Sequence, residues 1–332
     1  MNPAFLSRVV AFGALLGVAA GGDLLAQSPA QPRTVAQELN PAVFELARDI
    51  LPSSGIQLTN GIVVFASDWP TLVFAGFTAA TPTGPNVGSC TGTLVGPKVL
   101  LTAAHCLDNL FYAPRTASLK VDGRELALIC EQHPVYAARE ITFRVPKGSE
   151  DFALCRIDDQ GVIPATLTAM EFEVVNVETS PPPGEPVLLT GYGCSNLHFE
   201  NGRLASEREP QVLRIGDERI ETTAGVPDPT NYVTVRSNAL REPALCPGDS
   251  GGPMFTGVTS QDPTGPRRLR GVNSRVDPAP GAAVSHDVIS SVAATGNDTF
   301  RTWARDWLRR TRVHGTTICG LNARAGQGRC RS

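Results

Sequence analysis

The chain has 332 residues, of which 18% are charged, and its formal net charge at pH 7 is −3. This length can bury a sizeable core in one large domain or two small ones. The nearly balanced charge and the absence of a basic run exclude a protein that binds nucleic acid or an acidic membrane surface mainly by electrostatics. The 32 glycines and 27 prolines indicate many turns and short strands.

Residues 1–26 have the pattern of a secretory signal peptide. Arg8 supplies a positive charge, the apolar run "VVAFGALLGVAA" follows, and small residues come next, so cleavage is expected after Ala20 or Ala26. A membrane anchor is the alternative, but the apolar run is short for a membrane span. We therefore expect a secreted protein, extracellular or periplasmic, whose mature form has no contact with a membrane.

Residues 27–57 differ in texture from the remainder of the chain, and we interpret them as a pro-segment or N-terminal extension. Within them "AVFELARDIL", after Asn40-Pro41, carries apolar residues at helical spacing, and "PSSG" then ends the run. This pattern predicts a short helix.

From residue 58 to about residue 295, short runs rich in Val, Leu and Ile alternate with Gly, Pro, Asn and Asp. Runs such as "TLVFAGF", "TGTLVG", "KVLLTAA", "PVLLTGYG" and "YVTVRS" predict the antiparallel strands of a barrel or sandwich. The stretch "NDTFRTWARDWLRR" then predicts a helix with Asn297 or Asp298 as its N-cap. Its apolar stripe consists of Phe300, Trp303, Trp307 and Leu308.

All eight cysteines lie in the exported part of the chain. An even number in an oxidising compartment predicts four disulfides, and the lack of a C-x-x-C motif argues against a metal site. We expect neither a metal nor another cofactor. The cysteines are Cys90, Cys106, Cys130, Cys155, Cys194, Cys246, Cys319 and Cys330.

The stretch "GDSGGP" is the first of three that carry chemistry. A serine hydroxyl becomes a good nucleophile only when a base removes its proton and N–H donors hold the resulting oxyanion. A tight glycine-rich turn can aim the backbone N–H groups of Gly248 and Ser250 into one concavity. A lone motif of this kind is more often a surface turn, so it needs support elsewhere.

Two further stretches give that support. "VLLTAAHC" places His105 at the end of an apolar strand, and "SEDFALCRI" places Asp151 at the start of another. A carboxylate there can be buried against the far nitrogen of the imidazole. Asp158 and Asp159, at the other end of the second strand, are the solvated alternatives.

Together "LTAAHC", "DFAL" and "GDSGGP" resemble the trypsin/chymotrypsin-like serine peptidases, in that family's chain order of His, Asp and Ser. Cys90 before "TGTLVG", the "TGYG" at 190–193 and the Trp-bearing final helix also match. The resemblance implies an all-β fold of two packed six-stranded antiparallel β-barrels with a C-terminal helix. It covers residues 58–310 as the peptidase domain and leaves 311–332 as a Cys-containing tail.

The same resemblance implies a role for each site residue. His105 is the general base and acid, Ser250 the nucleophile, and Asp151 the group that orients the imidazole. The N–H groups of Gly248 and Ser250 form the oxyanion hole. Pro247 removes an N–H that is not one of these two donors.

The resemblance further implies a zymogen, in which Asp249 pairs with an α-amino group freed by cleavage. The usual Ile-Val-Gly-Gly start is absent, and the alignment makes Leu58 the candidate mature N-terminus, after Gln57 rather than a basic residue. The alternative start at Ile62-Val63 leaves too short a segment before Pro70.

Disulfide pairings follow from the resemblance in part. Cys90–Cys106 matches the family bridge that braces the histidine loop. The loops that hold Cys194 and Cys246 are neighbours in this fold, so we pair these two cysteines. Cys319 and Cys330 are expected to close a local loop in the tail, which leaves Cys130–Cys155.

Primary specificity depends on the residue six positions before the nucleophile. That residue is Ala244, with Leu245 beside it, and neither offers a carboxylate to pair with Arg or Lys. Ser274, in "GVNSRV", is expected in the wall of the same pocket, where its backbone can bind substrate. We therefore expect small or medium apolar side chains, unless Asp277 or Asp287 reaches the pocket.

These observations favour a secreted serine endopeptidase that acts as a monomer on protein or peptide substrates through an acyl-enzyme. The rival hypothesis is a catalytically silent binding protein on the same fold, which the presence of all three triad residues disfavours. A lipase or esterase is set aside because an α/β-hydrolase has Ser before Asp before His.

Overall fold

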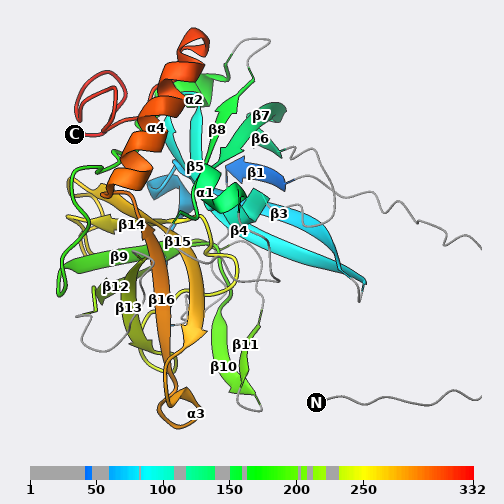
Figure 1. The fold of residues 1–332 in the computed structure, drawn as a ribbon, viewed down its shortest axis with the longest axis vertical. Coiled ribbons are helices and arrows are strands. Elements are labelled where there is room, and N and C mark those ends of the chain that lie inside the picture. The colour runs from blue at the N-terminus through cyan, green and yellow to red at the C-terminus, as the bar shows by residue number, and fades with distance from the viewer. Residues whose placement is uncertain are drawn as a thin grey trace, which may run out of the picture. The chain divides into compact units, whose positions relative to one another are not determined.

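Strands dominate the structure, and most of them form two large sheets (Figure 1). The computed structural model describes residues 42–46, 60–81, 84–107, 117–138, 150–158, 163–200, 203–207, 212–221 and 232–332. The expected signal peptide, the candidate start at Leu58 and Asp159 lie outside these ranges. Among the described helices, none has the length and apolar character that a membrane span requires.

The first sheet is a closed barrel of seven strands in the order β1-β3-β4-β5-β8-β7-β6. It contains the strands expected at "TLVFAGF", "TGTLVG" and "KVLLTAA", which are confirmed. The bounds are β1 (Ala42–Leu46), β3 (Leu72–Thr81), β4 (Gly84–Gly96), β5 (Val99–Thr102), β6 (Ala117–Val121), β7 (Arg124–Gln132) and β8 (Ala153–Ile157).

The second sheet is a seven-stranded half-barrel in the order β13-β16-β15-β14-β9-β12-β2, and a separate hairpin joins β10 to β11. The predicted all-β, two-barrel fold is thus confirmed, although the strand counts differ from six and six. The bounds are β2 (Ile62–Val63), β9 (Pro186–Gly191), β10 (Asn196–Glu200), β11 (Arg203–Glu207), β12 (Arg214–Arg219), β13 (Tyr232–Asn238), β14 (Pro253–Thr256), β15 (Arg268–Pro278) and β16 (Asp287–Ala294).

β1 corrects the prediction of a helix at "AVFELARDIL". It pairs antiparallel with β3 and parallel with β6, and so supplies the seventh strand that closes the barrel. Ala42 and Phe44 are buried whereas Val43 and Glu45 are partly exposed, which is the two-residue alternation of a strand. Over so short a run, apolar spacing cannot separate a helix from a strand, and pairing with two neighbours decides the outcome.

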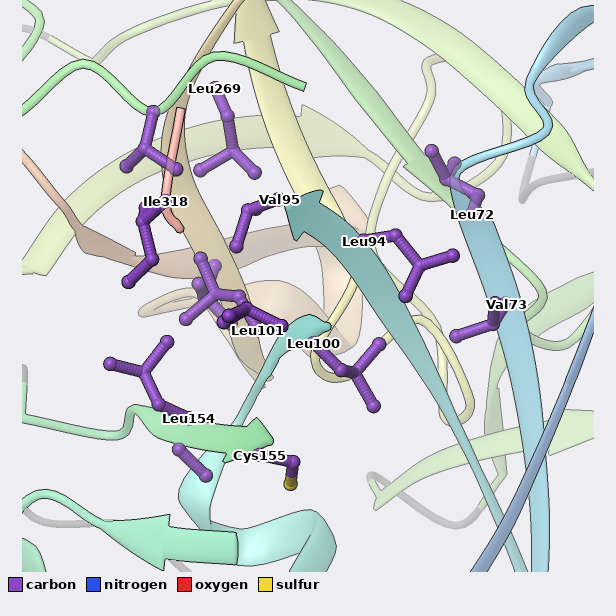
Figure 2. Close-up of a cluster of buried hydrophobic side chains, with 14 of the residues drawn as sticks. Leu72, Val73, Leu94, Val95, Leu100, Leu101, Leu154, Cys155, Leu269 and Ile318 are labelled. Carbon is purple, nitrogen blue, oxygen red and sulfur yellow. The ribbon is translucent and has the colours of Figure 1, made fainter. Parts of the chain in front are cut away.

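The core runs through both sheets. Figure 2 shows Leu94 and Val95 of β4 and Leu101 of β5 in one apolar cluster with Leu269 of β15. Ile318, from the tail after the last helix, lies in the same cluster and is fully buried. The tail is therefore part of the packed fold.

The C-terminal helix α4 (Asp298–Thr311) is confirmed, and Asn297 is its N-cap, because the Asn297 side chain accepts a 2.8 Å hydrogen bond from the Phe300 N–H. The ring centroid of Phe300 lies 4.8 Å from that of Phe152. All four residues of the predicted stripe are buried. The remaining helices are single turns, α1 (Pro134–Ala137), α2 (Ala165–Ala169) and α3 (Ala282–Ser285).

A buried ion pair joins Glu173 to Arg267 inside this core. The Arg267 guanidinium donates to Glu173 Oε1 at 2.6 Å and to Oε2 at 3.0 Å. It also lies over the indole of Trp69, 3.8 Å from the ring centroid. Thr71 Oγ1 donates to the same carboxylate at 2.7 Å. Two charges are thus held out of water by several direct contacts.

Candidate active site

His105 and Asp151 lie together because the strands that carry them are neighbours. His105 is in the single 3₁₀ turn after β5, Asp151 lies just before β8, and β5 pairs with β8. His105 Nδ1 is 2.7 Å from Asp151 Oδ2, and the His105 backbone N–H donates to Oδ1 at 2.9 Å. The Ser274 hydroxyl donates to Oδ2 at 2.6 Å.

These contacts determine the charge of Asp151, which is fully buried. Burial alone raises the pKa of a carboxyl, but the positive charge of His105 and the hydrogen bonds from His105 and Ser274 outweigh it. The pKa of Asp151 is therefore lowered, and the group is an anion facing the imidazole. By contrast, Asp158 is partly exposed and forms an ion pair with Arg156 at 3.1 Å.

Ser250 lies next to the histidine turn. Cys106 Sγ is 3.6 Å from the Ser250 carbonyl oxygen and 4.0 Å from His105 Nε2, so the two residues flank the same sulfur. The Ser250 hydroxyl donates to the Ser274 carbonyl at 3.3 Å. His105 and Ser250 are both partly exposed, whereas Asp151 behind them is enclosed.

Thr91, on β4 of the closed barrel, fixes the conformation of the serine loop. Its N–H donates to the Ser250 carbonyl at 2.7 Å and its hydroxyl donates to the Gly248 carbonyl at 2.9 Å. Gly248 and Gly251 have φ values of +110° and +85°, which favour glycine. A Cβ at Gly251 would also overlap the Thr91 carbonyl and the Thr102 hydroxyl. The loop is thus held by one residue of the other sheet.

The two expected oxyanion donors are adjacent in this loop. Within the described ranges, the N–H groups of Gly248 and Ser250 donate to no protein acceptor. Two free N–H groups beside a nucleophile can stabilise an oxyanion. Pro247 keeps its carbonyl, which accepts the Cys194 N–H at 3.0 Å, so the proline is compatible with the turn.

Four disulfides join Cys90–Cys106, Cys130–Cys155, Cys194–Cys246 and Cys319–Cys330. These are the pairings expected from the sequence. Among the described residues, the group with metal-ligand spacing is Cys90, His105 and Cys106. Its two sulfurs are bonded to each other and offer no thiolate, so the group reflects the bridge that braces the histidine turn.

Asp249 is buried behind the serine loop. Its Oδ1 accepts the Gly193 N–H at 2.7 Å and its Oδ2 accepts the Cys246 N–H at 2.8 Å. Burial raises its pKa to about 6, while these two hydrogen bonds and the positive charge of Arg214 act to lower it. The expected partner, an α-amino group at Leu58, falls outside the described residues.

The residues expected at the specificity pocket are apolar and buried. Ala244 is fully buried, and the Leu245 N–H donates to the Ser290 hydroxyl at 3.0 Å. Val276 lies opposite Ser290 on the paired strands β15 and β16, and packs against the clusters that contain Ala244 and Leu245.

Asp277 and Asp287, the two acidic alternatives for the pocket, both have other partners. Asp277 forms an ion pair with Arg275 at 2.9 Å. Asp287 lies 3.7 Å from the Arg236 guanidinium and accepts a hydrogen bond from Asn238 at 3.2 Å. Neither carboxylate is fully buried.

Three side chains at the site have no signal in the sequence. The Ser274 hydroxyl contacts Asp151, although only its backbone was expected to have a role. Tyr232 contacts that hydroxyl at 3.0 Å, and since the Ser274 hydrogen points to Asp151, Tyr232 is the donor. Arg214 lies near Asp249. All three lie far along the chain from the groups they affect.

Comparison with known proteins agrees with this geometry. The family model described as Trypsin matches residues 66–294, more than half of the chain. Human granzyme M is 27% identical over 227 residues, which cover 62% of this chain and 81% of granzyme M. The structure of neuropsin, a serine protease expressed in the limbic system of mouse brain, has a TM-score of 0.44 and 21% identity, and covers 66% of this chain and 88% of neuropsin. On the family match, the chain belongs to the trypsin/chymotrypsin-like serine proteases.

Proposed function

We propose that the protein is a secreted serine endopeptidase with Ser250 as nucleophile, His105 as general base and acid, and Asp151 as the orienting group. The observation that carries the proposal is the anionic Asp151, fully buried and bonded to both the ring and the backbone of His105. A carboxylate in this position favours the tautomer with its proton on Nδ1. Nε2 is then the basic atom, on the side where Ser250 lies.

The reaction that these residues support has two halves. Nε2 of His105 takes the proton of the Ser250 hydroxyl while Oγ bonds to the scissile carbonyl carbon, and the oxyanion is held by the N–H groups of Gly248 and Ser250. The C–N bond then breaks, and the imidazolium gives its proton to the leaving amine. A water molecule, deprotonated by the same imidazole, attacks the Ser250 ester and releases the acid.

We propose that residues 58–310 form the peptidase domain and act as a monomer on proteins or peptides outside the cytoplasm. β1 completes the barrel from the preceding segment, and the tail 311–332 packs on the core through Ile318. Four disulfides support an oxidising compartment. Whether cleavage is needed for activity, as a zymogen requires, depends on what balances the charge of Asp249.

We also propose a preference for small or medium apolar side chains before the scissile bond. Ala244 and Leu245 provide no charge for a buried guanidinium, and an unpaired buried charge is costly. Val276 and Ser290 occupy the neighbouring positions of the strands that flank them. Chromogenic peptides that differ only in Ala, Val, Leu, Phe or Arg at this position test the preference. A dominant signal from Arg would contradict it.

The endopeptidase proposal is tested with a fluorophosphonate probe and with casein. The wild-type protein should be labelled on Ser250, as located by peptide mapping, and should digest casein. Ser250→Ala should abolish both signals, while Ser180→Ala, which removes an exposed hydroxyl, should change neither. A folded wild-type protein that neither reacts with the probe nor digests casein would favour the silent binding protein instead.

A further inference from the structure

Arg214 is an arginine with no exposed surface, in the middle of a sheet. It lies on β12, opposite Gly191 of β9 on one side and Val63 of β2 on the other. Its Nη1 donates to the Gly193 carbonyl at 3.0 Å and to the Val212 carbonyl at 3.4 Å. Arginine keeps its proton in proteins, so a permanent positive charge is buried here.

A single peptide group connects this charge to Asp249. The carbonyl of Gly193 accepts the Arg214 guanidinium, and the N–H of Gly193 donates to Asp249 Oδ1 at 2.7 Å. The space around the carboxylate is filled, because a Cβ on Gly191 or Gly193 would overlap Asp249. The carboxylate is thus enclosed, with two backbone donors in direct contact and a cation one residue away.

These two buried charges compensate each other. An isolated charge is expensive inside a protein, whereas an opposite charge nearby offsets part of the cost. Accordingly, the positive charge of Arg214 lowers the pKa of Asp249 against the effect of burial. Asp249 therefore has a source of positive charge that belongs to the folded chain itself.

The chain on both sides of Leu58 is also part of the sheets. Ile62 and Val63 form β2, which pairs with Ile215 and Arg214. Upstream, β1 closes the barrel, and Phe44 within it is fully buried. Both segments have their places while the chain is continuous, so the fold around Asp249 does not wait for a cut between them.

We propose that Arg214 is a positioning residue for the oxyanion hole: through Gly193 it holds Asp249 inward in the uncut chain, so that catalysis does not require a new α-amino group. The inference rests on the proposed peptidase function. Asp249 lies between the two oxyanion donors, Gly248 and Ser250. If Asp249 turned outward to solvent, the peptide that joins it to Gly248 would rotate, and the hole would lose a donor.

The first test asks whether a cut matters. A recognition sequence for a site-specific protease is placed immediately before Leu58, and the same preparation is studied before and after cleavage, with intact mass and N-terminal sequencing to verify each form. We expect the fluorophosphonate to label Ser250 at rates within about twofold in the two forms. Labelling that is at least about 100-fold faster after the cut, the size expected for a lost oxyanion donor, would overturn the inference and leave the peptidase function intact. No labelling of either form would overturn both.

The second test removes the charge in the uncut chain. Arg214→Met should lower kcat on a chromogenic peptide by about 100-fold with KM changed less than about threefold, because the oxyanion exists only in the transition state. Arg214→Lys, which keeps a charge, should recover part of the loss. Arg219→Met, on the exposed side of the same strand, is the matched control and should behave as wild type.

A double variant separates positioning from folding. If Arg214→Met leaves Asp249 as an uncompensated buried charge, then Arg214→Met with Asp249→Asn should unfold at a higher temperature than Arg214→Met alone. Should Arg214→Met fail to fold, Arg214→Lys takes its place in the kinetic comparison. Wild-type kcat in a folded Arg214→Met protein, or in its place an Arg214→Lys protein that loses KM and kcat equally, would overturn the proposal.

Discussion

The Ser274 hydroxyl donates a 2.6 Å hydrogen bond to Asp151 Oδ2, the same oxygen that lies 2.7 Å from His105 Nδ1. One carboxylate oxygen therefore receives a donor from each sheet, since Ser274 is on β15 and Asp151 precedes β8. The Tyr232 hydroxyl donates to Ser274 at 3.0 Å and completes a chain of three hydrogen bonds. The position of the imidazole depends on how the two sheets meet.

Ser274→Ala tests this dependence. A hydrogen bond to a charged group contributes about 1.5–3 kcal/mol, so its loss should lower kcat by about 10- to 100-fold, with little change in KM. Tyr232→Phe removes a donor one step farther away and should have a smaller effect in the same direction. Steady-state kinetics on one chromogenic peptide measures both. An unchanged kcat in Ser274→Ala would show that Asp151 is held without it.

Asp151→Asn tests the choice of carboxylate. The amide cannot favour the same imidazole tautomer, and kcat should fall by about 10⁴-fold, the magnitude known for this triad in the family's reference enzymes. Asp158→Asn is the matched control, because this aspartate ends the same strand and pairs with Arg156 at the surface. Its kcat should stay near that of the wild type. A larger loss in Asp158→Asn would mean that Asp158 is the triad member.

Glu218 predicts a pH-dependent stability. Burial raises its pKa from 4.5 to about 7, repulsion from Glu242 and Asp217 adds to this, and a hydrogen bond from Ser237 opposes it. Because the folded-state pKa is the higher one, the folded protein binds the proton more tightly than the unfolded chain. The resulting stability is complete below about pH 4.5 and is lost as the pH rises through about 7.

Glu218→Gln should remove this dependence, since the amide stays neutral. At pH 8 the variant should be more stable than wild type by about 1 kcal/mol, a value reduced for the partial exposure of the group, which raises Tm by about 2–4 °C. At pH 4 the two proteins should unfold together. Glu200→Gln, on the exposed end of β10, is the control and should follow wild type at both pH values. Equal Tm differences at pH 4 and pH 8 would contradict the prediction.

The Glu173–Arg267 pair predicts a large and non-additive loss of stability. Arg267→Met leaves a buried carboxylate unpaired by its main partner, and should cost about 3–5 kcal/mol of unfolding free energy. Arg267→Met combined with Glu173→Gln should cost less than the sum of the two single changes. Urea unfolding with the disulfides intact measures the three variants. Strict additivity would show that the two charges do not interact.

The sequence predicts the parts of the site that lie in local motifs. His105, Asp151 and Ser250 each end or begin an apolar run, so their strands and order can be recognised from neighbouring residues alone. Ser274 and Arg214 cannot, because each acts on a group far along the chain: Ser274 and Asp151 are 123 residues apart. Such contacts depend on which strands become neighbours, and apolar alternation within a strand does not contain that information.

The same reasoning explains the error at β1. Its five residues fit a helical or an extended pattern equally, and the two unpaired edges that it satisfies are formed by strands later in the chain. The buried pair of Glu173 and Arg267 is also invisible locally, because 94 residues separate them. Charged residues are expected at the surface unless a partner is known.

β1 has a consequence for handling the protein. Without it, β3 and β6 would each present a row of free main-chain donors and acceptors, and the pocket filled by Phe44 would open to solvent. Exposed strand edges beside an apolar opening are sites where a second molecule can add its own strand. Recombinant versions that begin at Leu58 should therefore self-associate during refolding, and those that keep residues 42–46 should not.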